Sequence, residues 1–444
     1  MTTHRLRDVA LVLTSNVDKV IDLDERPIRL CNYVDVYKNN FIRNDMPFKP
    51  GTATASEIKK FGVQVDDVII TKDSETADDI GVPALVKSTA DDLVCGYHLS
   101  ILRADRRRMI GPFLYWHLLS KKSQEDFGNA ANGVTRYGLT LGGIKGIPIN
   151  VPDLATQRQI ADFLDRETTR IDLLIEKKQR LVALLGEREE GTFIEHVTGK
   201  DLPFEKKASG VEWIKEIPTH WFAPKFTHVA RQETGHTPSR KVEVYWVPEE
   251  CVIPWVSLAD VWQLRDGGKI HISDTSEKIS EIGMANSAAR LLPKDTVILS
   301  RTASVGFPAI MAKPMATTQD FAAWICGKQI RPLFLYYVLR AMKPEFRRLM
   351  MGSTHQTIYM PDIRSFRTPL PPLEEQDQII ARLSSTIQVF RQSATALTRS
   401  IDRLKEYRSA LITAAVTGQI DVTTYAKFGT PDRRLDAIQE EMGA

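Results

Sequence analysis

The sequence has little of what metal sites, disulfide scaffolds, membrane proteins and highly charged polyanion binders need. Its four cysteines lie far apart and form no CxxC pair, which favours reduced thiols over a zinc site or a disulfide framework. No stretch approaches the roughly 18 apolar residues of a membrane span, so we expect a cytoplasmic protein. The 59 basic and 56 acidic side chains leave a net charge of +3. Any nucleic-acid binding must therefore come from local patches.

Signatures of an autonomous enzyme are also missing. The segment Thr198-Gly199-Lys200 lacks the upstream glycine of a phosphate-binding loop, and neither HExxH nor an Asn/Asp-Pro-Pro-Tyr/Phe segment occurs. Asp274 and Glu277 have no further acidic partner that would complete a metal-dependent nuclease site. We therefore expect a non-catalytic chain with no cofactor and no metal of its own; a self-contained DNA-modifying enzyme is a minor alternative.

An internal repeat is the main feature that is present. Residues 133–199 align without a gap on residues 352–418, with identities that include paired glutamines and a closing Val-Thr-Gly. Shorter upstream matches join residues 80–84 with 305–309 and residues 112–116 with 332–336. A repeat of half the chain predicts two copies of one module, each with a globular part and a helical part. The globular parts have diverged much more than the helical parts.

Each helical part carries the pattern of a long helix, preceded by proline and followed by glycine. Its apolar residues recur at the a/d spacing of a coiled-coil seam. They are Ile160, Leu164, Ile171, Leu174, Leu181 and Leu185 in the first copy, and Ile379, Leu383, Phe390, Leu397, Leu404 and Leu411 in the second. The apolar side chains of this narrow stripe must be buried away from water, and we expect the two helices to bury them by pairing antiparallel. The alternatives are that each helix packs on its own globular part or on another protein.

The globular parts mix short β-branched runs, turn signals and short helical pieces, which favours an α+β class with two globular α/β domains around curved sheets. The long antiparallel helices would separate them, with an internal two-fold pseudo-repeat. The expected order is a globular domain at 1–150, a long helix at 151–199, a globular domain at 200–368, a long helix at 369–420 and a tail at 421–444. Residues 431–442 of the tail are a candidate short helix.

Three motifs mark the second copy. Residues 213–221 read Trp-Ile-Lys-Glu-Ile-Pro-Thr-His-Trp and open its globular part, residues 371–379 read Pro-Pro-Leu-Glu-Glu-Gln-Asp-Gln-Ile and open its helix, and residues 416–420 read Val-Thr-Gly-Gln-Ile and close it. Together with the two-copy layout, they resemble the DNA-specificity subunit of Type I restriction–modification systems over nearly the whole chain. The first copy departs from this pattern, because it lacks the Trp-Ile opener and has Asp-Leu-Ala-Thr-Gln at 153–157. We expect these departures to affect helix capping and domain docking.

The resemblance implies two target-recognition domains, each reading one half of a bipartite, asymmetric site in double-stranded DNA. It implies that the helices set the spacing of the half-sites and bind two modification subunits, which carry adenine-N6 methyltransferase chemistry with S-adenosylmethionine. Restriction subunits would add ATP-dependent translocation and cleavage. The alternative is a coiled-coil scaffold without sequence-specific DNA binding of its own.

Candidate DNA-binding residues are those whose side chains can read bases or hold phosphates from a polar loop. In the first domain they are Lys38, Asn39, Asn40 and Arg43, and in the second they are Thr237, Ser239, Arg240, Arg301, Thr302 and Ser304. A Gly-x-Thr turn shared by both copies adds Thr135, Arg136 and Tyr137 in the first and Thr354, His355 and Gln356 in the second. The alternative for each is a solvated polar loop. The basic clusters 106–108, 121–122 and 347–348 are more typical of a solvated face, and we expect His196 and His220 to be core or docking residues.

Overall fold

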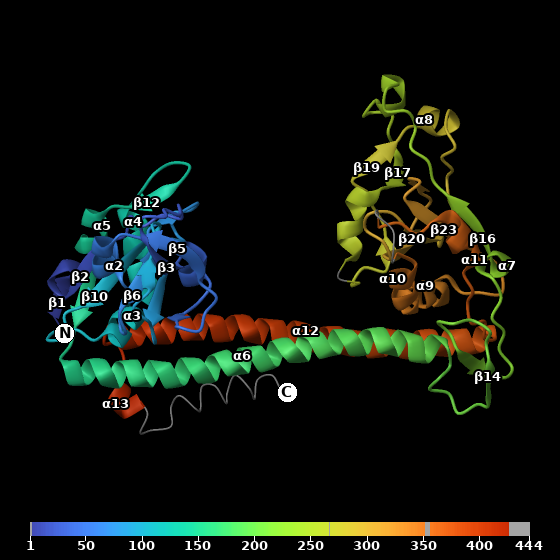
Figure 1. Ribbon diagram of the computed structural model, residues 1–444. Coiled ribbons are helices and arrows are strands. Elements are labelled where there is room, and N and C mark those ends of the chain that lie inside the picture. The colour runs from blue at the N-terminus through green and yellow to red at the C-terminus, as the bar shows by residue number, and fades with distance from the viewer. Residues whose placement is uncertain (1, 266, 351–355, 426–444) are drawn as a thin grey trace. The chain divides into compact units, whose positions relative to one another are not determined.

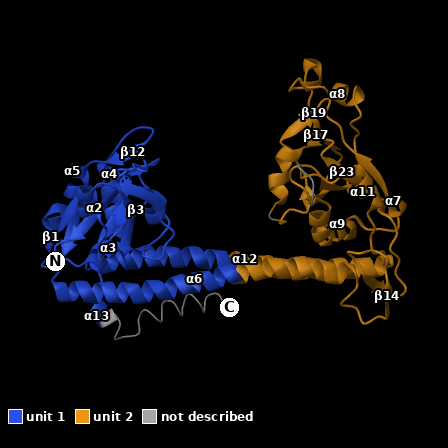
Figure 2. Cartoon of the chain, viewed as in Figure 1, with its two compact units in different colours: residues 1–180, 396–444 blue, residues 181–395 orange. Residues whose placement is uncertain are grey.

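The computed structural model describes residues 2–265, 267–350 and 356–425 (Figure 1). The chain forms two compact units, one of residues 1–180 and 396–444 and the other of residues 181–395 (Figure 2). Each unit contains one globular domain, part of helix α6 (Leu154–Val197) and part of helix α12 (Leu373–Val416). The expected helix at 431–442 lies outside the described residues.

Both globular domains are built on a five-stranded sheet of the same topology. In unit 1 the strand order is β2 (Ala10–Thr14), β10 (Leu99–Ala104), β6 (Val68–Thr71), β8 (Pro83–Val86) and β4 (Phe41–Ile42). In unit 2 it is β16 (Ala230–Thr234), β23 (Phe321–Cys326), β20 (Val297–Ser300), β21 (Pro308–Met311) and β18 (His271–Ile272). In each sheet only the last pair is parallel. The central strands β6 and β20 are buried along their whole length, as expected of continuous apolar runs.

A second sheet of three strands also has the same order and pairing in both units. It comprises β5 (Lys49–Ala53), β3 (Arg26–Cys31) and β9 (Leu93–Cys95) in unit 1, and β19 (Glu277–Ile279), β17 (Ile253–Val256) and β22 (Ala316–Thr317) in unit 2. Unit 1 adds β7 (Asp73–Ser74), β11 (Ala131–Asn132) and β12 (Tyr137–Leu139), and the pair β1 (Thr2–Arg5) and β13 (Pro148–Val151). Unit 2 adds the pair β14 (Lys206–Ala208) and β15 (Glu216–Pro218). The predicted α+β class and pseudo-repeat are therefore confirmed.

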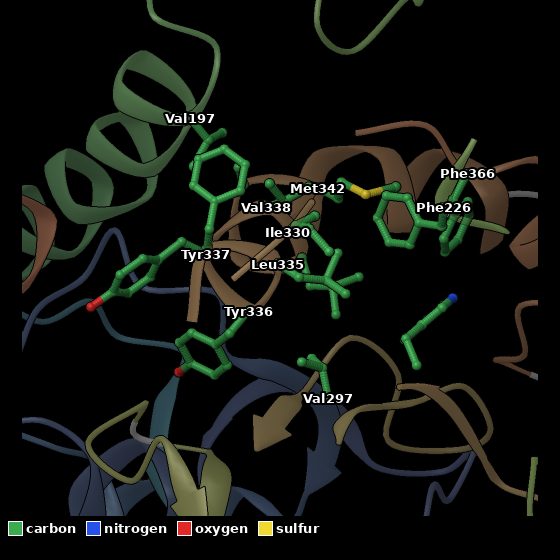
Figure 3. Close-up of a cluster of buried hydrophobic side chains, with 14 of the residues drawn as sticks. Val197, Phe226, Val297, Ile330, Leu335, Tyr336, Tyr337, Val338, Met342 and Phe366 are labelled. Carbon is green, nitrogen blue, oxygen red and sulfur yellow. The ribbon is translucent and has the colours of Figure 1, made fainter. Parts of the chain in front are cut away.

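Short helices complete the two units. Unit 1 has α1 (Tyr33–Tyr37), α2 (Ala55–Phe61), α3 (Gly111–Leu119), α4 (Lys121–Ala130), α5 (Leu141–Gly146) and α13 (Val422–Tyr425), with the 3₁₀ turn η1 (Leu6–Asp8). Unit 2 has α7 (Phe226–Val229), α8 (Glu281–Ala285), α9 (Pro332–Ala341), α10 (Lys343–Met350) and α11 (Met360–Ser365), with η2 (Glu243–Trp246) and η3 (Leu258–Leu264). Figure 3 shows Val197 of α6, Phe226 of α7, Val297 of β20 and Leu335 of α9 in one buried cluster of unit 2.

A buried glutamine fastens α6 to the globular domain of unit 1. The side-chain oxygen of Gln157 accepts a hydrogen bond from the Ile110 N–H at 3.0 Å. Its amide nitrogen donates to the carbonyl oxygens of Arg108 and Pro152, both at 2.8 Å. Because Gln157 is 0% exposed, every polar atom of this amide needs a partner inside the protein.

The second copy repeats this arrangement in unit 2. The side-chain oxygen of Gln376 accepts from the Arg331 N–H at 2.8 Å, and its nitrogen donates to the carbonyls of Gln329 and Pro371, both at 2.9 Å. Gln376 is also 0% exposed. The pairing of this residue with Gln157 in the repeat therefore has a structural cause, because only a primary amide supplies one acceptor and two donors in this geometry.

These hydrogen bonds correct one of the sequence matches. Because Ile110 and Arg331 hold equivalent places, residues 113–115 (Phe-Leu-Tyr) align with residues 334–336 (Phe-Leu-Tyr). The predicted match of 112–116 with 332–336 is therefore one residue out of register. The wrong register comes from aligning Pro112 with Pro332, although Pro112 is the second residue of its helix and Pro332 is the first of its own. Proline is tolerated at both positions because neither N–H has a partner within the helix.

The departures of the first copy from the family pattern also have a structural explanation. In unit 2 the carboxylate of Glu375 accepts a hydrogen bond from the Trp221 indole N–H at 2.9 Å and lies 2.8 Å from the His220 ring nitrogen. Glu375 thus docks the opener segment on α12. The first copy lacks that opener and has Thr156 at the equivalent position. There Asp153 caps α6, because its carboxylate accepts hydrogen bonds from the Thr156 N–H at 3.0 Å and from the Thr156 hydroxyl at 2.7 Å. This agrees with the expected effect on capping and docking.

The long helices lie side by side and antiparallel within each unit. In unit 1 Arg408 of α12 contacts Asp172 of α6 at 2.8 Å, and in unit 2 Arg391 of α12 contacts Glu189 of α6 at 3.1 Å. Buried residues of the predicted seam are Ile160, Leu164, Ile171, Ile379, Leu383, Leu404 and Leu411, and half-buried ones are Leu185, Phe390 and Leu397. The predicted pairing of the two helices is confirmed.

Two residues of the predicted seam need correction. Leu181 is 49% exposed, and Leu174 is half-buried next to a residue of the same helix that is buried more deeply. The inward positions are instead Ile175, which is 9% exposed, and the half-buried Val182. The seam advances by four residues after Ile171, because a helix of 3.6 residues per turn alternates steps of three and four.

Candidate nucleic-acid interface

Three backbone segments of unit 1 meet beyond the end of the central strand β6. Lys72 follows this strand, and its N–H donates to the carbonyl of His98 at 3.1 Å, in the turn that precedes β10. The Lys72 carbonyl accepts from the Leu139 N–H of β12 at 2.8 Å. We call residues 72–74, 96–98 and 137–139 the platform of unit 1.

Unit 2 has the same construction beyond β20. The Arg301 N–H donates to the Asp320 carbonyl at 2.8 Å, and the Arg301 carbonyl accepts from the Ile358 N–H at 2.9 Å. The bridge between Thr302 and Thr357 matches the pairing of β7 with β12. Residues 301–303, 318–320 and 356–358 therefore form the platform of unit 2.

The platform of unit 1 is rich in aromatic and charged groups. The ammonium of Lys72 lies 4.4 Å from the centroid of the Tyr97 ring, and a ring nitrogen of His98 lies 2.8 Å from an oxygen of Asp73. Tyr33 of α1 lies nearby. Burial is the main cause that raises the pKa of its phenol, and the carboxylates of Asp79, Asp73 and Glu75 raise it further, whereas Arg136 lowers it. This tyrosine is therefore neutral near pH 7 and available as a hydrogen-bond donor.

Five predicted residues lie at or beside the platform of unit 2. Gln319 joins two of them, because its side-chain oxygen accepts from the Thr237 hydroxyl at 2.8 Å and its carbonyl accepts from Arg301 Nε at 2.9 Å. Thr302 and Gln356 lie on the paired segments, and the exposed Gln356 accepts from the Ala303 N–H at 2.8 Å through its carbonyl. Ser304 follows directly, with its N–H bonded to the Thr302 carbonyl.

The shared Gly-x-Thr turn is the tip of the β11–β12 hairpin in unit 1. Thr135 and Arg136 are exposed there, and Tyr137 enters the platform. Gly133 has φ +145°, and a Cβ at this position would lie 2.0 Å from the Arg136 carbonyl oxygen, so only glycine fits the turn. The corresponding residues Thr354 and His355 lie outside the described residues.

Arg240 is held on an aromatic surface in unit 2. Its guanidinium lies 3.8 Å from the centroid of the Trp246 ring and 5.3 Å from that of Trp255. It also donates to Glu277 at 2.7 Å, and about half of its side chain is exposed. The neighbouring Ser239 is exposed, and its carbonyl accepts from the Trp246 indole.

The structure does not bring the loop near residue 40 to the platform. Its predicted residues Lys38, Asn39, Asn40 and Arg43 are exposed. However, β8 runs antiparallel to β6 and therefore ends near the start of β6. Because β4 runs parallel to β8, Arg43 at the end of β4 lies at the opposite end of the sheet from Lys72. Asn40 lines a hollow of about 200 Å³ together with Asp165 of α6 and Arg408 of α12. This placement favours a contact with the helices over a contact with the platform.

Most other basic clusters have intramolecular partners. Arg107 pairs with Asp105, Arg348 with Glu345, and Arg347 lies 3.7 Å from a carboxylate of α6. These partners are compatible with the expected solvated face.

Sequence reasoning missed Lys72, Tyr97 and His98 in unit 1 and Gln319 in unit 2. A usable signal was present, because both central strands are apolar and end in a hydroxyl residue followed by a cation, as Thr71-Lys72 and Ser300-Arg301. The hydroxyls have the same role, accepting from the N–H of Val82 and of Phe307 at 3.1 Å. Tyr97 and Gln319 carried no local signal and reach the platform only through the register of the sheet.

The described residues contain no group of three or more histidine, cysteine, aspartate or glutamate side chains that could hold a metal ion. The four cysteines are free, and burial raises the pKa of each thiol, that of Cys326 to about 12. These thiols are therefore protonated near pH 7. Within the described part of the chain, no helix is long and apolar enough to cross a membrane.

A duplicated α+β domain, followed each time by a long helix, is a fold that this chain shares with solved specificity subunits. The family of the Type I restriction modification DNA specificity domain matches residues 18–183 and 233–401. The chain therefore belongs to this family, which confirms the resemblance drawn from its motifs. The family description names a DNA specificity domain, in line with the expected DNA-recognition role.

Individual relatives agree with this assignment. The MjaIX specificity subunit of Methanocaldococcus jannaschii is 30% identical over 173 residues, which cover 38% of this chain and 39% of that one. The HindI specificity subunit of Haemophilus influenzae is 20% identical over 92% of this chain and 98% of its own length. The crystal structure of the HsdS subunit from Thermoanaerobacter tengcongensis has the same fold, with a TM-score of 0.57, 18% identity, and coverage of 94% of this chain and 97% of that one.

Proposed function

We propose that this chain reads a bipartite, asymmetric DNA site, with one half-site bound by the platform of each unit. The observation that carries the proposal is that the two platforms have the same backbone hydrogen bonds and different side chains. Tyr97 and Tyr137 in unit 1 stand where unit 2 has Gln319 and Gln356. Tyrosine and glutamine side chains offer different hydrogen-bonding groups to base edges. Two platforms with the same backbone structure would therefore read half-sites of different sequence.

The predicted recognition domains at 1–150 and 200–368 and the predicted DNA-binding residues belong to this proposal. Among the latter, those at the platforms and the hairpin tip have the strongest support. The loop Lys38–Arg43 has the weakest, because it lies toward the other end of its sheet.

The helices would act as the spacer between the half-sites. α6 and α12 each run for 44 residues without a break, and the glutamine at the start of each fixes it to its globular domain. We further propose that two modification subunits, with adenine-N6 methyltransferase activity, bind the chain and that restriction subunits join them. A cytoplasmic location follows from such partners, which act on cellular and incoming DNA.

Mapping of methylated adenines in a host genome that carries this chain and its modification subunit tests the proposal. We expect one methylated motif with two unlike, specified halves separated by a gap of fixed length. A continuous motif, or two identical halves, would contradict the two-reader arrangement. Methylation that needs no added modification subunit would contradict the non-catalytic role.

The spacer is tested separately by removing seven residues from both helices, which keeps the seam in register because the apolar stripe repeats every seven residues. We expect a shorter gap with both half-sites unchanged. A gap of unaltered length in a folded variant would exclude the helices as the spacer.

A further inference from the structure

The two platforms share one charged position. Lys72 and Arg301 follow the central strands, and the N–H and carbonyl of each are bonded to the same two neighbouring segments. Other side chains at equivalent positions differ in chemical type: Asp73 and Thr302, Tyr97 and Gln319, His98 and Asp320, Tyr137 and Gln356. A cation is therefore kept where most of the surrounding polar groups have changed.

Unlike half-sites still have the phosphate backbone in common. Phosphate contacts fix the position of a protein on the duplex and carry no direct sequence information, whereas contacts with base edges specify the sequence. A group retained in two readers of different sequences fits a phosphate, and groups that differ between them fit bases.

Lys72 is prepared for such a contact. Its side chain is only 13% exposed, and the face of Tyr97 holds its ammonium in place. Asp73 lies 3.8 Å from the ammonium, beyond hydrogen-bond distance, and the same oxygen is 2.8 Å from the ring nitrogen of His98. The positive charge of Lys72 is therefore positioned but not directly hydrogen-bonded to a carboxylate.

Arg301 is positioned by backbone carbonyls. Its Nε donates to Gln319 at 2.9 Å and its Nη1 to Ile358 at 3.4 Å, and no carboxylate among the described residues pairs with it. A guanidinium has five N–H groups, so donors remain for a phosphate oxygen. Because both side chains are already ordered, little conformational entropy is lost when they bind.

We propose that Lys72 and Arg301 are equivalent phosphate anchors, each holding one backbone phosphate of the half-site bound by its own unit. The inference rests on the proposed function and assigns these two residues to affinity and register, not to base choice.

The test measures affinity of the assembled methyltransferase complex for its mapped site over a range of salt concentrations. The variants Lys72→Gln and Arg301→Gln remove the charge. Arg106→Gln and Lys328→Gln are matched controls, since both residues are exposed and follow β10 and β23 at the end away from the platform. Each phosphate contact contributes a slope of about 0.9 to the fall of log K with log salt. We expect each anchor variant to lower that slope by about 0.9, the double variant by about twice as much, and neither control to change it.

Two further measurements separate an anchor from a base reader and from a folding defect. The conservative variants Lys72→Arg and Arg301→Lys should restore the slope. A neutral methylphosphonate placed at one phosphate of a half-site should weaken the wild type and leave the matching Gln variant unaffected. This scan of the wild type also tests the proposal if a Gln variant does not fold.

An unchanged slope in folded anchor variants, or a changed methylated motif, would overturn the anchors while leaving the two-reader function intact. A wild type that binds no specific site would overturn the proposed function itself, and the anchors with it.

Discussion

Replacing the buried glutamine of the second copy tests how the long helix is fixed to its globular domain. Gln376→Ala removes three hydrogen bonds and leaves the Arg331 N–H and the carbonyls of Gln329 and Pro371 without their partner. A buried polar group left unpaired costs about 1–3 kcal/mol. Three such groups at the lower part of that range give an expected loss of about 3–5 kcal/mol in the unfolding free energy of unit 2.

Gln378→Ala is the matched control, because Gln378 lies on the same helix and is exposed. We expect its effect to stay within about 0.5 kcal/mol, as for most surface substitutions. Tryptophan fluorescence in a urea titration follows the right unit, since Trp116 is the one tryptophan of seven that lies in unit 1. Hydrogen exchange at the Arg331 amide gives a local readout and should become faster in Gln376→Ala alone. Equal stability of the two variants would refute the role of Gln376 in fixing α12 to its globular domain.

Three further predictions follow from single residues. Burial lowers the pKa of His117 to about 4, so its neutral form is favoured in the folded state. The unfolding free energy should therefore fall by about 3 kcal/mol as the pH drops from about 6.5 to 4. His117→Gln should remove that part of the dependence of the melting temperature on pH. Gly133→Ala should weaken binding of one half-site, measured by footprinting, about tenfold or more. The reason is that strain at this turn costs more than about 1.4 kcal/mol, which corresponds to a factor of ten in affinity. Gly146→Ala is the control and should leave binding unchanged, because a Cβ at Gly146 meets no atom within 4 Å. Arg240→Ala should weaken the other half-site by a similar factor, whereas Lys241→Ala should have a smaller effect because no aromatic ring positions that exposed side chain.

The parts of the fold that depend on local patterns could be predicted from the sequence. Residues such as Ile160 and Leu383 repeat at coiled-coil spacing and are buried in the helix pair. The identity of Gln157 and Gln376 pointed to a shared structure, although its hydrogen bonds could not be read from the repeat. The error at Leu181 arose because the a/d pattern leaves the choice between adjacent apolar positions open, and packing decides it.

The candidate site was harder to predict, because sheet pairing assembles it from distant segments. Arg301 and Gln356 were singled out for their residue type, and the structure joins them through backbone pairing. Lys72 was missed because the loop that it opens, residues 72–79, is rich in acidic side chains and lacks the cluster of amide and basic groups expected of a DNA contact. Lys38 and Asn40 looked equally suited to bind DNA, yet strand direction places this loop away from the platform.

Exchange of one recognition domain tests the central claim most directly. Residues 201–368 are replaced by the equivalent segment of another specificity subunit, and the methylated adenines of the host genome are mapped before and after. The account predicts that one half of the motif changes, while the other half keeps its sequence. A change in both halves, or in neither, would contradict the assignment of one half-site to each unit.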